Sequence, residues 1–423
     1  MKKIIYTGQS AEELFGAREE MSMAAEQTVR EIIQNVRANG DKALKSYAAK
    51  FDGYTGDLYV TDEEIQEAMA SLDPAYIRTL QHSIDNISEF HRAQKRTGFE
   101  IKRPGVVLGE RIIPVKRAGL YIPGGTAAYP STLLMNAIPA KIAGVEEIIV
   151  ATPVKADGKV KPEVLTAAKM CGVTRILKIG GAQAIAALAY GTESVPRVDK
   201  ITGPGNIFVA TAKRLVASEV CGIDMVAGPS EILVVADEYA NPVHVAADLL
   251  SQAEHDKLAS ALLICTSGTL ADAVMAEIQR QVKLLPRVEI AGASIDSNCK
   301  IIVCPDTDTA IEVANEYAPE HLELCIQNAR ENLEKVKNAG SVFLGYNTPE
   351  AVGDYYAGAN HTLPTSGTAR FASPLGVDDF VKTTQYMEYT PEALEAAAED
   401  IISFAESEGL TAHGESVAVR FRK

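Results

Sequence analysis

Several features that would define other classes of protein are missing from this 423-residue sequence. No apolar run approaches the roughly 20 residues that a membrane-spanning helix needs, and the basic opening MKKIIYTGQS lacks the apolar stretch of a signal peptide. Asp and Glu outnumber Lys and Arg, giving a net charge of −15, whereas nucleic acids and anionic membranes are bound by clustered basic residues. We therefore expect a cytoplasmic protein that binds neither nucleic acid nor membranes.

Cysteine is also scarce. The chain has six cysteines, and Cys265, Cys304 and Cys325 lie within or at the ends of short apolar runs. No C-x-x-C pair occurs. Cysteines in apolar runs are typical of buried small hydrophobic residues, and disulfides are unusual in the cytoplasm. A thiol-dependent aldehyde or acyl-phosphate reductase is thus a weak alternative, because its chemistry needs a reactive cysteine in a polar loop.

What the sequence does contain is typical of a multidomain α/β protein. Its length, with 47% hydrophobic and 23% charged residues, predicts a globular chain with more than one core. The first hundred residues are mainly helical, with capping boxes at Ser10–Glu13 and Thr61–Glu64 and a helix that begins at Asp73–Pro74. A β-rich segment, FEIKRPGVVLGERIIPVKRAGLYIP, follows these helices.

Strand-like and helix-like segments then alternate, which predicts βαβ units and mainly parallel sheets. A second α/β block begins near Asp237, where Asn241 caps a helix that Pro242 opens, and the chain turns to a helical tail from about Phe371. The predicted fold class is α/β, with two nucleotide-binding-like domains between a helical N-terminal segment and a helical C-terminal tail. The predicted boundaries are 1–100 for the N-terminal segment, 101–236 and 237–370 for the two α/β domains, and 371–423 for the tail.

Glycine-rich turns are the first candidates for a binding site. IPGGT, IGGAQ and TGPGN each follow a strand-like run and precede a helix-like one, and VAGPSEIL adds a further turn. Free N–H groups at helix starts favour anions, although any one such turn could be only a tight connection. None matches G-x-G-x-x-G, so the standard dinucleotide fingerprint is absent. Several at successive strand ends favour a phosphate-bearing cofactor, which in such folds binds at the carboxyl ends of the strands.

Histidine placement is more informative, since the chain has only seven histidines. We expect His82 and His91, on an amphipathic helix, to lie at the surface or an interface. In SQAEHD, Gln252 and His255 would share one helix face. Other histidines also lie near carboxylates: His321 follows Glu320, His361 follows Asp354 by seven positions, and His413 follows Glu408 by five. Each alone could be a hydrogen-bonded structural group, whereas together they supply the ligand types of a zinc site. Spacing does not establish that they converge.

Longer stretches are more specific in combination than any single turn or histidine. They are GLYIPGGTAAYPSTLLMNAIPAKIAG, GPGNIFVATAKRLV, DMVAGPSEILVVAD, DLLSQAEHD, YAPEHLEL, GDYYAGANHTLPTSGTARF and EGLTAHGESV. In this order they resemble the histidinol dehydrogenase family over nearly the whole chain. The resemblance implies an NAD-dependent enzyme that oxidises L-histidinol to L-histidine through L-histidinal in two steps. It also implies one Zn²⁺ per active site, aldehyde-dehydrogenase-like domains, and a homodimer with shared active sites.

The resemblance also implies a role for individual residues. The zinc ligands would be Gln252, His255, Asp354 and, from the partner subunit's tail, His413, with zinc positioning the substrate. His321 would be the general base in both oxidations, and Glu320 would activate the water that attacks the aldehyde. Substrate contacts would add Ser230, His361 and Glu408 to the zinc ligands and His321. The NAD contacts would be Tyr121, Gln183 and Asn206.

A metal-binding or nucleotide-binding module without enzymatic activity is the remaining alternative. Such a module would not account for the adjacent Glu320 and His321 or for the ligand-bearing tail. The pair could be an ordinary solvated pair before a strand, but the match of the surrounding stretch makes an active-site role the better interpretation.

Overall fold

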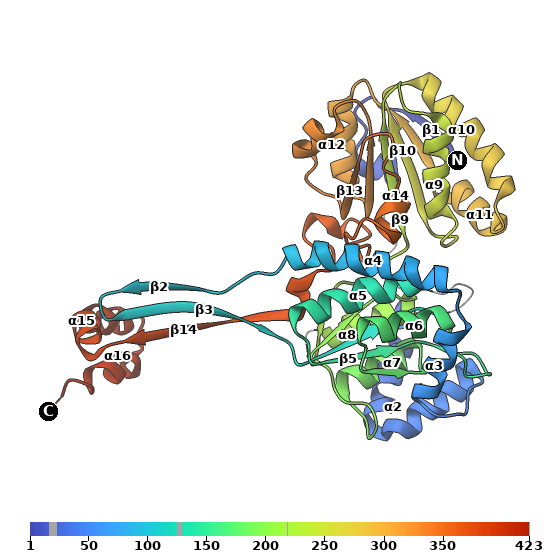
Figure 1. Ribbon diagram of the computed structural model, residues 1–423. Coiled ribbons are helices and arrows are strands. Elements are labelled where there is room, and N and C mark those ends of the chain that lie inside the picture. Colours follow the sequence, from blue (N-terminus) through green and yellow to red (C-terminus); the bar gives the residue numbers. More distant parts are fainter. Residues whose placement is uncertain (17–22, 125–128, 218, 423) are drawn as a thin grey trace. The chain divides into compact units, whose positions relative to one another are not determined.

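We describe a computed structural model, in which residues 1–16, 23–124, 129–217 and 219–422 are described (Figure 1). The chain divides into two compact units. One combines Met1–Gln94 with Val115–Phe380, and the other combines Lys95–Pro114 with Val381–Lys423. The larger unit contains two parallel sheets, as the α/β fold class predicts. The domain boundaries drawn from the sequence remain a prediction.

The first sheet has five parallel strands in the order β6-β5-β4-β7-β8. Its strands are β4 (Arg117–Tyr121), β5 (Glu147–Ala151), β6 (Arg175–Leu177), β7 (Lys200–Thr202) and β8 (Gly222–Ile223). The helices between them are α5 (Pro130–Ala143), α6 (Pro162–Cys171), α7 (Gly181–Tyr190) and α8 (Ile207–Ala217). Counted from β4, the order is 3-2-1-4-5, the strand order of a dinucleotide-binding half-fold.

The second sheet repeats this order. It has six parallel strands, β1-β11-β10-β9-β12-β13, so that β9 to β13 again run 3-2-1-4-5. Its strands are β1 (Lys2–Ile5), β9 (Glu231–Ala236), β10 (Ser260–Cys265), β11 (Lys300–Val303), β12 (His321–Cys325) and β13 (Ser341–Leu344). Helices α9 (Pro242–Ala253), α10 (Gly268–Gln281) and α11 (Val288–Asn298) share one apolar core with the sheet, and α12 (Thr307–Tyr317) shares the core of the other face. The central strands β9, β10 and β12 are buried along most of their length, which explains their largely apolar runs.

The N-terminal helices begin where the sequence predicts. Both capping boxes form, at α1 (Ala11–Phe15) and α3 (Asp62–Ser71), and Asp73 caps α4 (Pro74–Ala93). The long α2 (Met23–Tyr47) kinks at Gly40, whose φ of 46° and ψ of −130° are not helical. The segment is not wholly helical, however, because β1 pairs with β11 of the second sheet.

His91 was expected at the surface or an interface, and the structure excludes the surface. Its side chain is completely buried, its Nδ1 lies 2.8 Å from the Ile87 carbonyl oxygen, and its Nε2 lies 3.2 Å from Asn360 Nδ2. A helix face that packs against a distant part of the chain looks, in sequence, like any amphipathic face. The expected exposure of His82 agrees with the structure.

The smaller unit is a three-stranded antiparallel sheet with a helical pair. Its strands, in the order β14-β3-β2, are β2 (Phe99–Arg103), β3 (Val106–Pro114) and β14 (Val381–Tyr389). Helices α15 (Pro391–Ser407) and α16 (Thr411–Ala418) pack against each other. The tail predicted as helical from about Phe371 therefore contains a nine-residue strand, VKTTQYMEY, before its two helices. Its β-branched and aromatic residues favour an extended conformation, so the helical prediction is wrong for this stretch.

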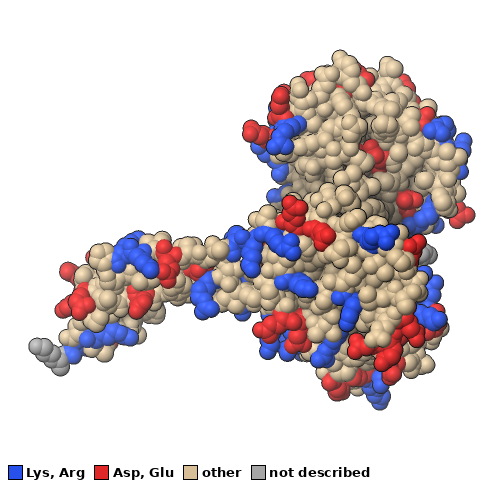
Figure 2. Space-filling view, viewed as in Figure 1, with Lys and Arg blue, Asp and Glu red and all other residues tan. Residues whose placement is uncertain are grey.

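Exclusions drawn from composition can also be compared with the structure. All six cysteines are free and buried, which confirms the prediction made for Cys265, Cys304 and Cys325. No helix among the described residues is long and apolar enough to cross a membrane. On the face shown in Figure 2, basic and acidic side chains are interspersed, and neither sign forms a continuous field.

Candidate active site

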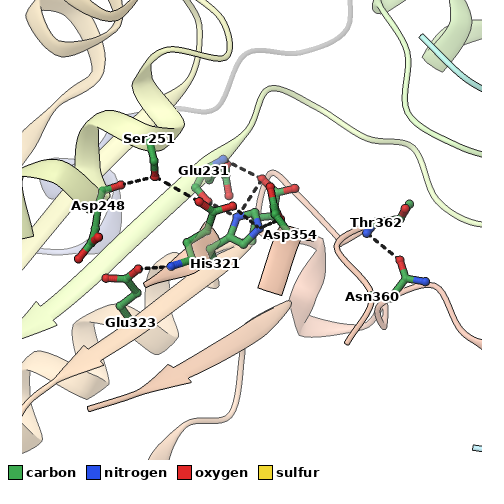
Figure 3. A network of polar contacts seen from close by, with 10 residues as sticks. Glu231, Asp248, Ser251, His321, Glu323, Asp354, Asn360 and Thr362 are labelled. Atoms are coloured by element: carbon green, nitrogen blue, oxygen red, sulfur yellow. Dashed lines mark hydrogen bonds and ion pairs between the residues drawn. The ribbon is translucent and has the colours of Figure 1, made fainter. Parts of the chain in front are cut away.

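A buried polar cluster lies at the amino ends of β9 and β12 (Figure 3). Glu231 is the first residue of β9, His321 is the first residue of β12, and Glu320 precedes it. These residues lie at the edge of the sheet opposite to the one expected for ligands in parallel α/β folds. The expectation of carboxyl-end binding is therefore wrong for this cluster.

The remaining members of the cluster come from helices. Gln252 lies in the last turn of α9, and Glu350 and Asp354 lie in α14 (Glu350–Tyr355). Helix α9 follows β9 and runs back toward the amino edge of the sheet, so its last turn arrives near the starts of the strands. Glu350 instead opens α14, and its contacts with Ser251 and Glu323 hold it there. Topology thus brings together residues that are about a hundred positions apart.

His321 has its two ring nitrogens in different environments. Nδ1 lies 2.9 Å from the backbone oxygen of Glu231, which can only accept a hydrogen bond, so we assign the proton to Nδ1. Nε2 then carries the lone pair, is buried, and has no hydrogen-bond partner among the described residues. It lies 3.9 Å from an oxygen of Glu350 and 3.9 Å from one of Asp354. Burial lowers the pKa of His321 and favours the neutral ring.

Glu320 is the second buried group of the predicted catalytic pair. Its Oε2 accepts a hydrogen bond from the backbone N–H of Glu231 at 2.8 Å and lies 3.6 Å from His321 Nδ1. Burial raises its pKa well above the ordinary value, and the nearby carboxylates of Glu231, Asp354 and Glu350 raise it further. The two residues are therefore not a solvated pair.

Glu350 is a member of the cluster that the sequence interpretation missed. It is buried, its backbone N–H donates to Glu323 Oε1 at 2.8 Å, and the Ser251 hydroxyl donates to its Oε2 at 3.2 Å. Burial, with Asp354 beside it, raises the pKa of Glu350 to about 7. Burial likewise raises the pKa of Asp354 to about 6. An available signal was their spacing of four residues in EAVGD, which places both carboxylates on one helix face.

The cluster has the donors that a divalent metal needs. Ligand atoms of His321, Glu350 and Asp354 all lie within 4.8 Å of one another. The Gln252 side chain is 1% exposed, and neither of its polar atoms has a hydrogen-bond partner among the described residues. A buried amide without partners is costly unless a ligand satisfies it. Imidazole, carboxylate and amide donors together fit Zn²⁺.

His255 is placed less tightly than this group. It lies in the turn just after α9, is half-buried, and its backbone N–H donates to the Gln252 carbonyl. Its side chain does not belong to the three-residue group of ligand atoms found among the described residues, in which His321 takes part instead. The assignment of His255 as a zinc ligand stays a prediction.

The predicted substrate contacts lie in both units. Ser230 precedes β9 and is half-buried, and His361 is half-buried, with a pKa that burial lowers to about 4. Glu408 follows α15, and His413 lies in α16, so both belong to the smaller unit, where they are exposed.

The predicted NAD contacts lie at the carboxyl ends of the first sheet. Tyr121 ends β4, and its hydroxyl accepts a hydrogen bond from Gly181 N–H at 3.0 Å. Gln183 is buried in the first turn of α7. The Asn206 side chain accepts from the backbone N–H of Phe208 at 3.1 Å at the start of α8. These turns follow the first, third and fourth strands of the half-fold, although residues 125–128 of the IPGGT turn lie outside the described residues.

Comparison with known proteins shows which family the chain belongs to. A family model described as histidinol dehydrogenase matches residues 16–421. The chain belongs to the histidinol dehydrogenase family. A histidinol dehydrogenase from Lactococcus lactis is 51% identical over 428 residues, covering 100% of this chain and 99% of that protein. The crystal structure of histidinol dehydrogenase from Elizabethkingia anophelis matches with a TM-score of 0.94 at 37% identity, covering 99% of this chain and 98% of that one.

The family fixes the reaction class. Histidinol dehydrogenases are oxidoreductases that catalyse the final steps of histidine biosynthesis, and the family is NAD-dependent and contains zinc. A putative methylmalonate-semialdehyde dehydrogenase from Sinorhizobium meliloti shares the fold, with a TM-score of 0.50 at 12% identity, covering 87% of this chain and 86% of that one. This second likeness concerns the fold alone and agrees with the predicted aldehyde-dehydrogenase-like domains.

Proposed function

We propose that the buried cluster around Glu320 and His321 carries both oxidations of L-histidinol, first to L-histidinal and then to L-histidine. The observation that carries the proposal is Nε2 of His321, a buried lone pair that has no hydrogen-bond partner among the described residues and lies 3.9 Å from carboxylate oxygens of Glu350 and Asp354. When bound, Zn²⁺ would hold the substrate's amino and imidazole nitrogens, and NAD would accept a hydride in each oxidation.

His321 acts as the base in this proposal. Its Nε2 takes the hydroxyl proton of the alcohol as the carbon is oxidised, while Nδ1 keeps its hydrogen bond to the Glu231 carbonyl. That hydrogen bond fixes the ring and stabilises the cation that forms. After the proton has left the site, His321 takes the hydroxyl proton of the hydrated aldehyde in the second oxidation.

Glu320 acts between the two oxidations. Its carboxylate removes a proton from the water that attacks the aldehyde carbon. A raised pKa suits this role, because a carboxylate with an ordinary pKa is a poor base near neutral pH. Once bound, the metal cation would lower the pKa of Glu320, which keeps it ionised.

For zinc we propose Gln252, His255, Asp354 and His413 of the partner subunit as ligands. Asp354 is one of the three residues whose ligand atoms lie together, and the buried Gln252 amide, next in sequence to Ser251, has no hydrogen-bond partner among the described residues. In this assignment His321 and Glu350 stand beside the metal and leave Nε2 free for the substrate. Ser230, His361 and Glu408 would complete the substrate pocket, Glu408 with a charge suited to the amine.

We further propose a homodimer in the cytoplasm, in which each active site takes residues from both chains. The smaller unit supports this arrangement because it is too small to bury its own apolar residues. Several large side chains there are exposed: Phe99, Ile101, Met387, Tyr389, Ile401, Phe404 and Leu410. Apolar residues gathered in this way are typical of protein interfaces.

The decisive experiment follows NADH formation from L-histidinol together with the histidine produced. Two NADH per histidine are expected, and a chelator should abolish the reaction until Zn²⁺ is returned. One NADH per substrate with release of the aldehyde would contradict the two-step proposal. Full activity after verified removal of the metal would contradict the zinc assignment.

A further inference from the structure

We propose that Asp52 binds the ribose hydroxyls of the adenosine half of NAD, and that it makes the enzyme select NAD over the 2′-phosphorylated dinucleotide. The inference deepens the proposed function and rests on the dinucleotide lying at the carboxyl ends of the first sheet. It assigns a specificity role to a segment outside that sheet.

No carboxylate directly follows the strand of this sheet that normally supplies one to the ribose. In a half-fold of order 3-2-1-4-5, an acidic residue after the second strand binds the ribose hydroxyls. The second strand here is β5, and it is followed by Thr152, Pro153 and Val154, none of which carries a charge. The first carboxylate after β5 is Asp157, which is exposed and whose Oδ1 accepts a hydrogen bond from the Lys159 N–H at 3.1 Å. A buried carboxylate for the ribose must therefore come from elsewhere in the chain.

The segment that contains Asp52 packs at this place. It is the short π-helix Ala48–Asp52, followed by Gly53 and Tyr54. Ala48 and Tyr54 form an apolar cluster with Val154, in the loop that follows β5. A Cβ on Gly53 would lie 3.4 Å from the Cβ of Ala156 in the same loop. The π-helix is thereby held over the carboxyl end of β5.

The segment also reaches the neighbouring strand. Lys178 follows β6, and its Nζ lies 5.9 Å from the centre of the Tyr54 ring. Its ammonium is paired with Glu64 Oε1 at 2.6 Å and is nearly buried, so its charge is already balanced. Lys178 is therefore poorly placed to bind a 2′-phosphate on the ribose.

The carboxylate of Asp52 has an unused acceptor. Its Oδ2 is buried and has no hydrogen-bond partner among the described residues. Its charge acts on Tyr121, the residue that ends β4: burial raises the pKa of the Tyr121 phenol to about 12, and Asp52 contributes to the rise. Asp52 itself is half-buried and its segment packs on the loop after β5, so its carboxylate can turn to accept hydrogen bonds from a ribose diol there. A 2′-phosphate would instead bring negative charge against it.

Binding of two probes that lack the nicotinamide separates this role from catalysis. Calorimetry would compare ADP-ribose with 2′-phospho-ADP-ribose on the zinc-loaded enzyme. Asp52→Asn, which preserves shape, should weaken ADP-ribose about tenfold, the loss expected for a charge-assisted hydrogen bond. It should also reduce the preference for ADP-ribose over the 2′-phosphorylated probe, and the KM for NADP should fall relative to the KM for NAD.

Asp57→Asn is the matched control, since Asp57 is an exposed carboxylate five residues along the same segment. It should leave both affinities unchanged, and Asp52→Ser should reproduce the loss of preference if the charge is responsible. An unchanged affinity ratio in folded Asp52 variants would overturn the assignment while leaving the proposed reaction intact. Failure of the unaltered enzyme to bind ADP-ribose would overturn both the assignment and the placement of NAD on this sheet.

Discussion

At the residue scale, the two ring nitrogens of His321 have different roles. Nδ1 anchors the ring to the Glu231 carbonyl, and Nε2 is left for chemistry. In His321→Asn the Asn amide can still donate toward that carbonyl but supplies no base. We expect kcat to fall by about 10²- to 10⁴-fold, the usual contribution of a general base.

Zinc content measured on the same variant distinguishes a base from a ligand, because His321 also lies among the residues that could hold a metal. Retained stoichiometric zinc with lost turnover is expected. Loss of zinc in the folded variant would place His321 among the ligands and require a different base.

The carboxylates around His321 predict a pH-dependent stability of the zinc-free protein. The pKa of Asp354 is raised to about 6 and that of Glu350 to about 7, whereas the ordinary value for both residue types is about 4. The folded state therefore binds these protons more tightly than the unfolded chain does, and the contribution of these two carboxyls to stability falls as pH rises from about 4 to about 7.

Thermal unfolding of the chelated protein should show this fall, and the stabilisation by added Zn²⁺ should grow over the same pH range because the cation replaces the protons. Glu350→Gln, which cannot ionise, should flatten the profile. A zinc effect that is independent of pH would contradict the proposed carboxylate shell.

At the scale of the element, α14 carries both Glu350 and Asp354 on one short turn. Ser251 and the backbone contact with Glu323 hold Glu350, which in turn orients Asp354. Glu350→Gln keeps the shape and the hydrogen bond from Ser251 but removes a charge beside the metal. We expect about 10- to 100-fold weaker zinc binding, measured by competition with a chelator, as for other supporting residues of metal sites. Unchanged zinc affinity would show that Asp354 is positioned without Glu350.

The TGPGN turn is held by a buried ion pair between two elements. Lys213 in α8 lies 2.5 Å from Asp224 Oδ1 and donates to the Gly203 carbonyl at 2.8 Å, while Gly203 N–H donates to Asp224 Oδ2 at 2.8 Å. Lys213→Met leaves a buried carboxylate without its partner and should cost about 3–5 kcal/mol. Denaturant unfolding would measure this cost.

Adding Asp224→Asn to Lys213→Met should recover part of the lost stability, because no buried charge then remains unpaired. If the ion pair positions the turn that carries Asn206, the KM for NAD should be higher in the double variant than in the unaltered enzyme. A double variant with an unaltered KM would reduce the pair to a purely structural role.

How much could be predicted from the sequence differs between elements. Helix starts at Ser10, Thr61, Asp73 and Asn241 were predictable because a helix cap depends only on residues within a few positions of one another. The pairing of β1 with β11 was not predictable, because it joins residues about 300 positions apart. Glu350 was missed for a related reason: an acidic residue in the first turn of a helix is ordinarily solvated, and only packing against the second sheet buries it.

At the scale of the whole molecule, the proposed zinc shell takes one of its ligands from a second chain. Gln252 and Asp354 lie in the larger unit, whereas His413 lies in the smaller one, within a helix whose neighbours expose apolar side chains. The family resemblance assigns His413 to the partner's active site, and that assignment can be tested without any structure of the dimer.

Purified heterodimers of His255→Ala and His413→Asn subunits provide this test. If the partner's His413 completes each site, one of the two sites in such a heterodimer is intact and the other carries both lesions. Activity should then reach about half that of the unaltered dimer, as the two-fold symmetry of the sites requires. The reciprocal heterodimer pairs an unaltered subunit with one that carries both substitutions, and it should be inactive because each of its sites has one lesion. If His413 instead served its own chain, the two results would exchange, with the first heterodimer inactive and the second half-active.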